Sequence, residues 1–200
     1  MTLTQEIRDR RVAVAEDVLL QLDRTDVPLR VGGEPGYICG EPGYISGVDH
    51  TGSAAYEGLN LDGNLKDQVD IVQRNCTVCA MGALLLSKAR LLDEVPMADL
   101  AYKHREVEDR IIFIGRADTV RLLKDTFDAD TLTRAEAFFE GSCMHMRDAD
   151  YYLGGMAAYA SSMSSSRERL VMLADNIVRN RGEFIVPAKY LKDVEGEYSD

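Results

Sequence analysis

The feature that most constrains the fold is the run of small and apolar residues from Cys76 to Leu86, Cys-Thr-Val-Cys-Ala-Met-Gly-Ala-Leu-Leu-Leu. Such a run is apolar on almost every side of a helix, which is typical of a helix buried at the centre of a domain. Asn75 is a good residue before a helix start, so we expect a helix that begins at Cys76. Small side chains at helical spacing would form one ridge for close packing: Cys76, Cys79, Ala80, Ala83 and Ser87.

Apolar residues at helical spacing predict further helices on both sides of this run. The first spans roughly Thr4 to Asp23, with Val14 and Val18 on its inner face and Arg11 and Asp17 on its wet side. Other helical segments are expected at about 66–92, 97–108 and 118–126. Because the remaining strand signals are confined to residues 111–114 and 184–186, the predicted fold is mainly α. We expect one compact domain over residues 1–200, with about six helices and at most two or three short strands.

Capping residues define the last two predicted helices. Asp128 suits the position before a helix, and Gly141 suits the position after its end. Ser165 and Glu168 match a capping box, and the helix that they begin is expected to stop at Gly182. The inner faces of these two helices share apolar residues at helical spacing: Leu132, Ala135, Phe138 and Phe139 in one, and Leu170, Leu173, Ala174 and Ile177 in the other.

An irregular, glycine-rich insert is predicted at residues 31–65. It contains a tandem repeat, Gly-Glu-Pro-Gly-Tyr-Ile, that starts at Gly33 and again at Gly40. Pro-Gly pairs favour turns, so the repeat is either a tolerant surface loop or a contact loop that presents Tyr37 and Tyr44. A small-ligand site for nucleotides in the 33–47 loop is an alternative. The acidic tail at residues 193–200 is expected to be loose.

Charge limits the classes of partner. The 200 residues include 34 acidic and 23 basic side chains, a formal net charge of -11. This charge repels phosphate backbones and anionic membranes, so we expect neither direct nucleic-acid binding nor membrane binding. A protein with a basic surface is the expected partner, and a homodimer through the last helices is an alternative. The start of the chain has no secretory signal pattern, and four cysteines without one favour a cytoplasmic protein with reduced thiols.

Two pairs of potential metal ligands raise alternatives to simple packing. Cys76 and Cys79 have zinc-ligand spacing, and Cys143 with His145 would complete a tetrahedral Cys3His site. A thiol at a helix start could also serve redox chemistry. In a third alternative, a cysteine hydrolase, Cys76 is the nucleophile and His145 the base. Since free cysteine behaves as a small buried hydrophobe, packing is the favoured interpretation, and no cofactor is expected unless zinc binds.

Two aspartates and an aromatic residue form another candidate contact patch: Asp148, Asp150 and Tyr151. Either aspartate could orient His145 in a hydrolase, although the same residues suit a solvated helix start. The sequence contains no glycine-rich phosphate loop followed by a lysine and no convincing pair of carboxylates for acid–base work. The balance favours a protein that is not an enzyme.

Three segments resemble a group of small uncharacterised proteins from phages, prophages and bacteria. They are residues 75–87, with the CxxCAxGAL-like pattern; residues 127–141; and residues 167–184. The resemblance implies a compact helical protein of phage or accessory-gene origin and brings no activity with it. Together with the charge, it predicts a non-catalytic acidic binding protein, such as a phage-encoded inhibitor or modulator of a host defence or nucleic-acid-processing protein.

Overall fold

The computed structural model describes residues 4–31, 45–47, 60, 62–92, 95–97, 121–140 and 165–191. Within these ranges the chain is mainly helical, as predicted. The longer helices are α1 (Gln5–Asp23), α3 (Ala80–Leu91), α5 (Ala129–Glu140) and α7 (Ser166–Arg179). The shorter elements are η2 (Lys66–Gln68), α2 (Val69–Asn75), α8 (Ala188–Leu191) and the strands β1 (Ile45–Gly47) and β2 (Cys76–Val78).

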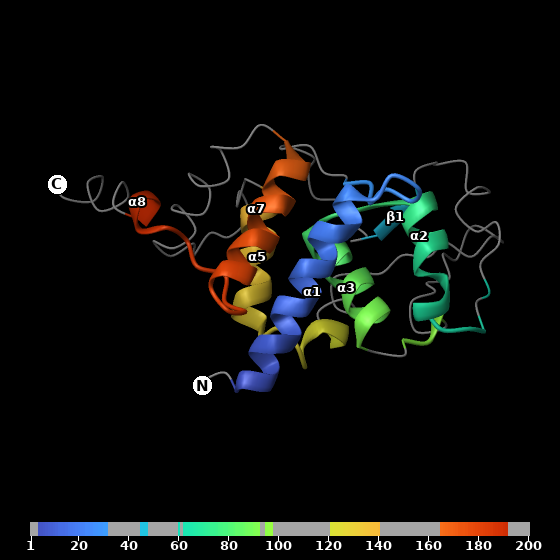
Figure 1. Cartoon of the computed structure of the whole chain (residues 1–200), viewed down its shortest axis with the longest axis horizontal. Coiled ribbons are helices and arrows are strands. Elements are labelled where there is room, and N and C mark those ends of the chain that lie inside the picture. Colours follow the sequence, from blue (N-terminus) through green and yellow to red (C-terminus); the bar gives the residue numbers. More distant parts are fainter. Residues whose placement is uncertain are drawn as a thin grey trace, which may run out of the picture.

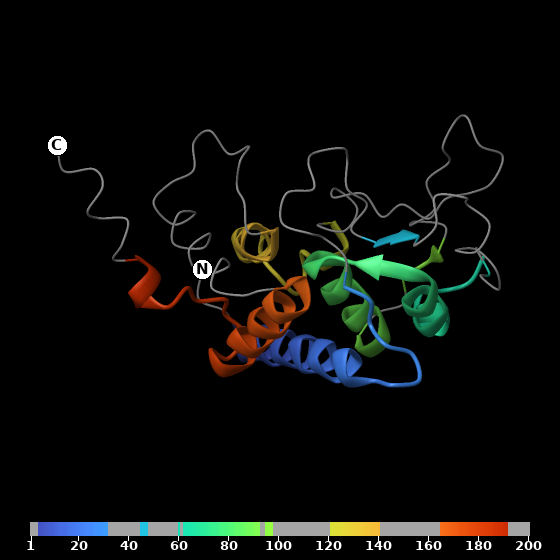
Figure 2. The same ribbon diagram turned by 90° about the horizontal axis from the view of Figure 1, so that it is seen from above.

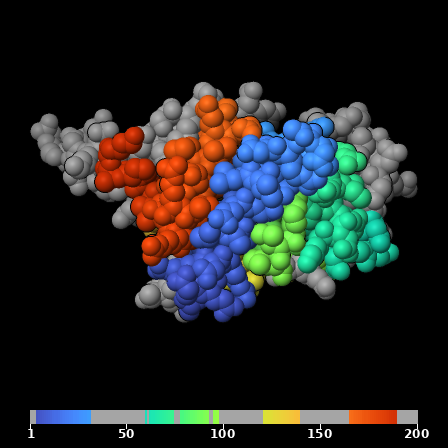
Figure 3. Space-filling model, in the orientation of Figure 1, coloured from blue at the N-terminus to red at the C-terminus, as the bar shows by residue number. Residues whose placement is uncertain are grey.

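The helices pack in layers around α3 and α7. Helix α1 lies across one face of the molecule, where it contacts both α7 and α3, and α5 packs behind them (Figures 1 and 2). In the space-filling view α1 separates the surface of α7 from that of α2 and α3 (Figure 3). The apolar faces of these helices meet in one buried cluster, so segments from both ends of the chain share a core.

Helix α1 agrees with its predicted bounds but not with its predicted wet face. The Thr4 hydroxyl accepts a hydrogen bond from the Ile7 amide at 3.3 Å and so caps the helix start. Val14 is buried on the inner face, as predicted. Arg11 and Asp17 were expected on the wet side, and this prediction is wrong because both are buried. Their charges are satisfied by partners on other elements, which the pattern of a single helix does not reveal.

The predicted helix start at Cys76 is also wrong. Residues Cys76–Val78 form strand β2, which pairs antiparallel with β1, and Asn75 is the last residue of α2 rather than a cap. The Val78 amide also donates to the carbonyl of Arg30 at 2.9 Å. Thr77 and Val78 are β-branched and therefore suit a strand when such partners are available. The chain turns helical only after Cys79, which occupies the N-cap position of α3 in an extended conformation.

Helix α3 confirms the prediction of a buried central helix, with a later start. Every residue from Ala80 to Ala89 is buried, including Ser87 and Lys88. The predicted ridge of small side chains is therefore shorter than expected, since its first member lies on β2 and not on the helix. Cys79 is half-buried and packs against the core beside this helix.

Helices α5 and α7 confirm the predictions made from their caps. The Asp128 carboxylate accepts from the Thr131 amide at 2.8 Å, and the Ser165 hydroxyl accepts from the Glu168 amide at 3.1 Å. The apolar residues predicted to face inward are buried: Leu132, Ala135, Phe138, Phe139, Leu170, Leu173, Ala174 and Ile177. Helix α7 ends at Arg179, slightly before the predicted stop.

Several predicted features fall partly or wholly outside the described residues. Residues 98–120, with the predicted strand at 111–114, the tail at 193–200 and most of the 31–65 insert lie outside them. Residues 121–123 are helical, as expected. Residues 184–186 belong to no helix or strand, and Phe184 and Val186 are buried on either side of an exposed Ile185. In the part of the chain that is described, no helix has the length and apolar character needed to cross a membrane.

Candidate functional site

Most of the site residues predicted from the sequence lie outside the described residues: Tyr37, Tyr44, Cys143, His145, Asp148, Asp150 and Tyr151. The backbone of Cys76 lies in β2 and Cys79 precedes α3, so the first pair bridges a strand and a helix. Within the described ranges, no group of three or more His, Cys, Asp or Glu side chains is arranged to hold a metal ion. The zinc and hydrolase hypotheses, which need Cys143 or His145, therefore stay predictions.

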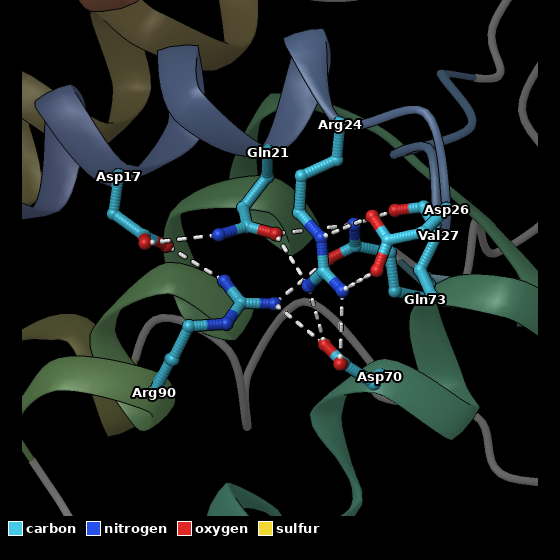
Figure 4. A network of polar contacts seen from close by, with 8 residues as sticks. All are labelled: Asp17, Gln21, Arg24, Asp26, Val27, Asp70, Gln73 and Arg90. Atoms are coloured by element: carbon cyan, nitrogen blue, oxygen red, sulfur yellow. Dashed lines mark hydrogen bonds and ion pairs between the residues drawn. The ribbon is translucent and has the colours of Figure 1, made fainter.

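The most developed polar cluster is a closed ring of four side chains between α1, α2 and α3 (Figure 4). Arg90 donates to Asp17 at 2.7 Å and to Gln73 at 2.8 Å. Gln73 donates to Gln21 at 3.4 Å, and Gln21 donates to Asp17 at 3.1 Å, which closes the ring. Gln73 is wholly buried and also donates to a backbone carbonyl at 2.6 Å. We refer to these four residues as the polar ring.

Arg24 connects the polar ring to solvent. Its guanidinium donates to Gln21 at 3.1 Å, and it forms two hydrogen bonds with each of Asp26 and Asp70, at 2.7–3.1 Å. Both aspartates are more than half exposed, whereas Arg24 is half-buried between them. Arg90 lies 3.7 Å from the Asp70 carboxylate and so couples the two arginines through one acid. We call Arg24, Asp26 and Asp70 the rim. The rim joins the end of α1 to α2.

The electrostatics of the rim oppose proton transfer. Hydrogen bonds from Arg24 hold the pKa of the Asp26 and Asp70 carboxyls well below its usual range, against the opposing effect of desolvation. The same bonds raise the pKa of Arg24. A general base works best with a pKa near the working pH, so these ionised carboxylates are weak bases at neutral pH. Among the described residues, every buried side-chain nitrogen or oxygen has a hydrogen-bond partner. The arrangement is suited to locking three helices together.

Arg11 fastens a second group of segments. The guanidinium is buried and donates to the Thr126 carbonyl at 2.6 Å, to the Asp128 carboxylate at 2.8 Å and to the Gly182 carbonyl at 3.3 Å. It also lies 5.5 Å from the centre of the Phe127 ring, a distance that allows a cation–π contact. One side chain of α1 thereby joins the segments before α5 and after α7.

Lys88 and Arg169 bind carbonyls near helix ends in the same way. The Lys88 ammonium donates to the Leu122 carbonyl and to the Asp125 carboxylate, the latter at 2.6 Å. Arg169 donates to the Phe139 carbonyl near the end of α5 at 2.5 Å, and burial lowers the pKa of its guanidinium. Cations are favourable near the carboxyl ends of helices, where carbonyls lack partners. These buried cations therefore have structural roles.

Charge is divided unevenly between the described residues and the rest of the chain. The described residues, which we call the helical frame, carry seventeen acidic and seventeen basic side chains. The other residues carry seventeen acidic and only six basic ones, which completes the totals of 34 and 23. The net charge of -11 thus comes entirely from sequence outside the helical frame. Asp148 and Asp150, predicted as contact residues, belong to that part.

The polar ring was missed from the sequence, although part of its signal was present. Asp17, Gln21 and Arg24 follow one another at intervals of four and three residues, which places them on one side of a helix. Such a polar line beside an apolar stripe can indicate a buried network. Its partners Gln73 and Arg90 are far away in sequence and carry no matching pattern.

Comparisons with known proteins give no family for the chain. No family model, curated protein or solved structure matches it.

Proposed function

We propose that this protein is a non-catalytic binding protein whose excess negative charge contacts a basic surface on another protein. The observation that carries the proposal is the formal net charge of -11, which comes from 34 acidic against 23 basic side chains. Complementary charge increases association rates and selects partners more than it adds affinity. The frame then serves as a support that the polar ring keeps in one arrangement.

Three segments resemble small phage and prophage proteins, and for this reason we propose a bacterial partner. We propose action in a bacterial cytoplasm, as an inhibitor or modulator of a host defence or nucleic-acid-processing protein. Proteins that handle nucleic acid have basic grooves, and an acidic protein can occupy such a groove. Asp148, Asp150 and Tyr151 are the proposed contact residues, with Tyr37 and Tyr44 as further aromatic contacts.

The test is capture of partners from a bacterial lysate on the immobilised full chain, followed by elution in steps of increasing salt. We expect a basic protein to be retained at low salt and released as the salt concentration rises. The variant Asp148→Asn/Asp150→Asn should release it at a lower salt concentration. The matched control Glu16→Gln/Asp67→Asn removes two exposed acids of the helical frame and should behave as the wild type.

Two outcomes contradict the proposal. The first is that no protein is retained at low salt. The second is that both double variants weaken retention equally, because bulk charge alone would then explain the binding. Elemental analysis of the same preparation, purified without added metal, tests the alternative: stoichiometric zinc would favour a site with Cys76, Cys79, Cys143 and His145.

A further inference from the structure

After α7 the chain continues as an arm that leads away from the helical body. Residues 182–187 lead from the end of α7 to α8, and Figures 1 and 2 both show α8 standing apart from α1, α5 and α7. We call residues 182–191 the C-terminal arm. Because it follows a turn, the arm can separate from the helices that it packs against without disturbing their order.

The arm packs against side chains of α7 and α5, and we call this packing surface the seat of the arm. The Asn176 amide pairs with the backbone of Ile185: its Nδ2 donates to the carbonyl at 2.7 Å, and its Oδ1 accepts from the amide at 2.8 Å. Phe184 is buried with its ring centre 5.3 Å from that of Phe138 on α5, and Val186 is buried two residues later. One side-chain amide and an apolar seat therefore hold an extended segment in register.

Helix α1 supplies the remaining contacts of the arm. Arg8 donates to the Glu183 carboxylate at 3.2 Å, and Arg11 donates to the Gly182 carbonyl at 3.3 Å. All contacts named for the arm are made with the chain's own α1, α5 and α7. An identical seat on a second copy of the chain would offer the same contacts to the same arm, which is the condition for exchanging an element between protomers.

The turn before the arm contains a strained residue. Arg181 has a φ of 55°, in the left-handed region, and Gly182 has a φ of 91°. The Gly182 amide donates to the Ile177 carbonyl at 2.8 Å and the Arg181 amide to the Val178 carbonyl at 3.1 Å, the pattern of a Schellman C-cap. Glycine normally occupies the left-handed position of this motif, because a side chain there crowds the backbone. The closed arm thus depends on an arginine where glycine is preferred.

From these observations we infer that a second copy of this chain is a partner, bound by reciprocal exchange of the C-terminal arms. In the exchanged dimer each arm lies in the other protomer's seat of Asn176, Phe138 and Arg11, and Arg181 leaves the left-handed region. The contacts with Asn176, Phe138 and Arg11 are kept, the two cap hydrogen bonds from Arg181 and Gly182 to the end of α7 are exchanged for bonds to water, and the strain at two hinges is released. Short hinges under strain favour this kind of exchange. The inference is independent of the proposed function.

The first test is a series at position 181, with the dimer fraction measured by light scattering across a range of concentrations. Tolerance of the left-handed region falls from Gly to Asn to ordinary residues, and β-branched Val is worst. The dimer fraction should therefore rise in the order Arg181→Gly, Arg181→Asn, wild type, Arg181→Val. We expect Arg181→Gly to weaken the dimer by about tenfold or more, since about 1.4 kcal/mol is tenfold in affinity.

The order across the series separates strain from charge. The Gly, Asn and Val variants have the same charge, so a charge effect would place all three on one side of the wild type. A monomer at every concentration in all four proteins would overturn the inference. A dimer fraction that does not change in the predicted order across the four proteins would overturn it as well.

The second test locates the arm in the dimer. Arg8→Glu and Glu183→Arg each place like charges where α1 now pairs with the arm. Exchange predicts that an equal mixture of the two variants gives a larger dimer fraction by light scattering than either variant alone, since both ion pairs are restored in the mixed dimer. A mixture that dimerises no more than its components would mean that each arm stays in its own seat, which would overturn the inference.

Discussion

At the scale of single residues, the turn after α7 contains two neighbouring residues, Arg181 and Gly182, that are constrained for different reasons. Gly182 needs to be glycine: a Cβ atom there would lie 3.0 Å from the Arg8 carbonyl oxygen and 3.1 Å from the Arg8 Cα. Its positive φ excludes most side chains as well. Arg181 is exposed, so its side chain has space, and its cost lies in the backbone alone. One position is therefore limited by space and conformation, and the other by conformation only.

We predict that Gly182→Ala lowers the free energy of unfolding by about 1–3 kcal/mol, because the backbone of α1 would have to move away from the new methyl group. Arg181→Gly should act in the opposite direction and raise it by about 1 kcal/mol, since glycine removes the left-handed penalty. Urea denaturation of the monomer at low concentration measures both. If Gly182→Ala is as stable as the wild type, α1 does not pack against this turn as described.

Gln73 is the residue on which the polar ring most depends, because it is wholly buried and has partners on both sides of its amide. Gln73→Leu keeps most of the volume but removes one hydrogen-bond partner from each of Arg90, Gln21 and the Val27 carbonyl. We expect a loss of about 1–3 kcal/mol, the cost of unsatisfied buried groups. Arg24→Gln at the exposed rim is the control and should cost less than about 1 kcal/mol. Equal losses in urea denaturation would show that the ring and the rim are not distinct.

At the scale of elements, the polar ring and the rim fix the positions of α1, α2 and α3. The rim carries a pH dependence whose sign follows from Asp70. Hydrogen bonding to Arg24 lowers the folded-state pKa of Asp70 below its ordinary value of 3.8. The stabilisation is therefore fully present above that value and is lost as the pH falls through the lower, folded-state pKa. The position of α2 against α1 is then expected to weaken in acid.

We predict that the wild type loses stability more steeply than Asp70→Asn between about pH 5 and pH 2, since only the wild type has this carboxylate to protonate. The difference should stay below about 1 kcal/mol, because the side chain of Asp70 is half exposed and solvent screens the pair. Urea denaturation at several pH values measures it. Parallel pH profiles would contradict the account of the rim, and Glu16→Gln on the outer face of α1 is the control.

The elements also show which parts of the fold local sequence patterns predict. Helix α1 follows from the spacing of its apolar residues, and α5 and α7 follow from their capping residues Asp128 and Ser165, which act within their own turns. The start predicted at Cys76 fails because β2 is formed by partners elsewhere in the chain, β1 and Arg30. Local propensity is a weak guide where such distant pairing competes with it.

The candidate site was less predictable than the fold. Asp17 and Arg11 are polar residues at positions that look solvated in a helix considered alone, yet both are buried by other elements. Their partners on other elements lie between 73 and 171 residues away along the chain. A single sequence does not contain the pairing information for such contacts. Charge composition, in contrast, is local to each segment, and it is the part of the functional argument that the sequence alone supports.

At the scale of the whole molecule, we propose that the helical frame is a support for acidic contact residues elsewhere in the chain. The helical frame is neutral in formal charge and is fastened by buried cations such as Arg11 and Lys88, each joined to several segments. The negative charge belongs to the rest of the sequence. An acidic binder of this kind should associate fast at low salt and lose that advantage as ions screen it, while dissociation changes less.

Surface plasmon resonance with the purified captured partner, at several ionic strengths, measures the association rate constant on which the proposed function depends. We expect Asp148→Asn/Asp150→Asn to slow association by about threefold or more at low salt, and we expect this difference to shrink as salt is added. Glu16→Gln/Asp67→Asn should retain the wild-type rate. Equal rates for all three proteins, or a slower rate only for the variant in the helical frame, would contradict it.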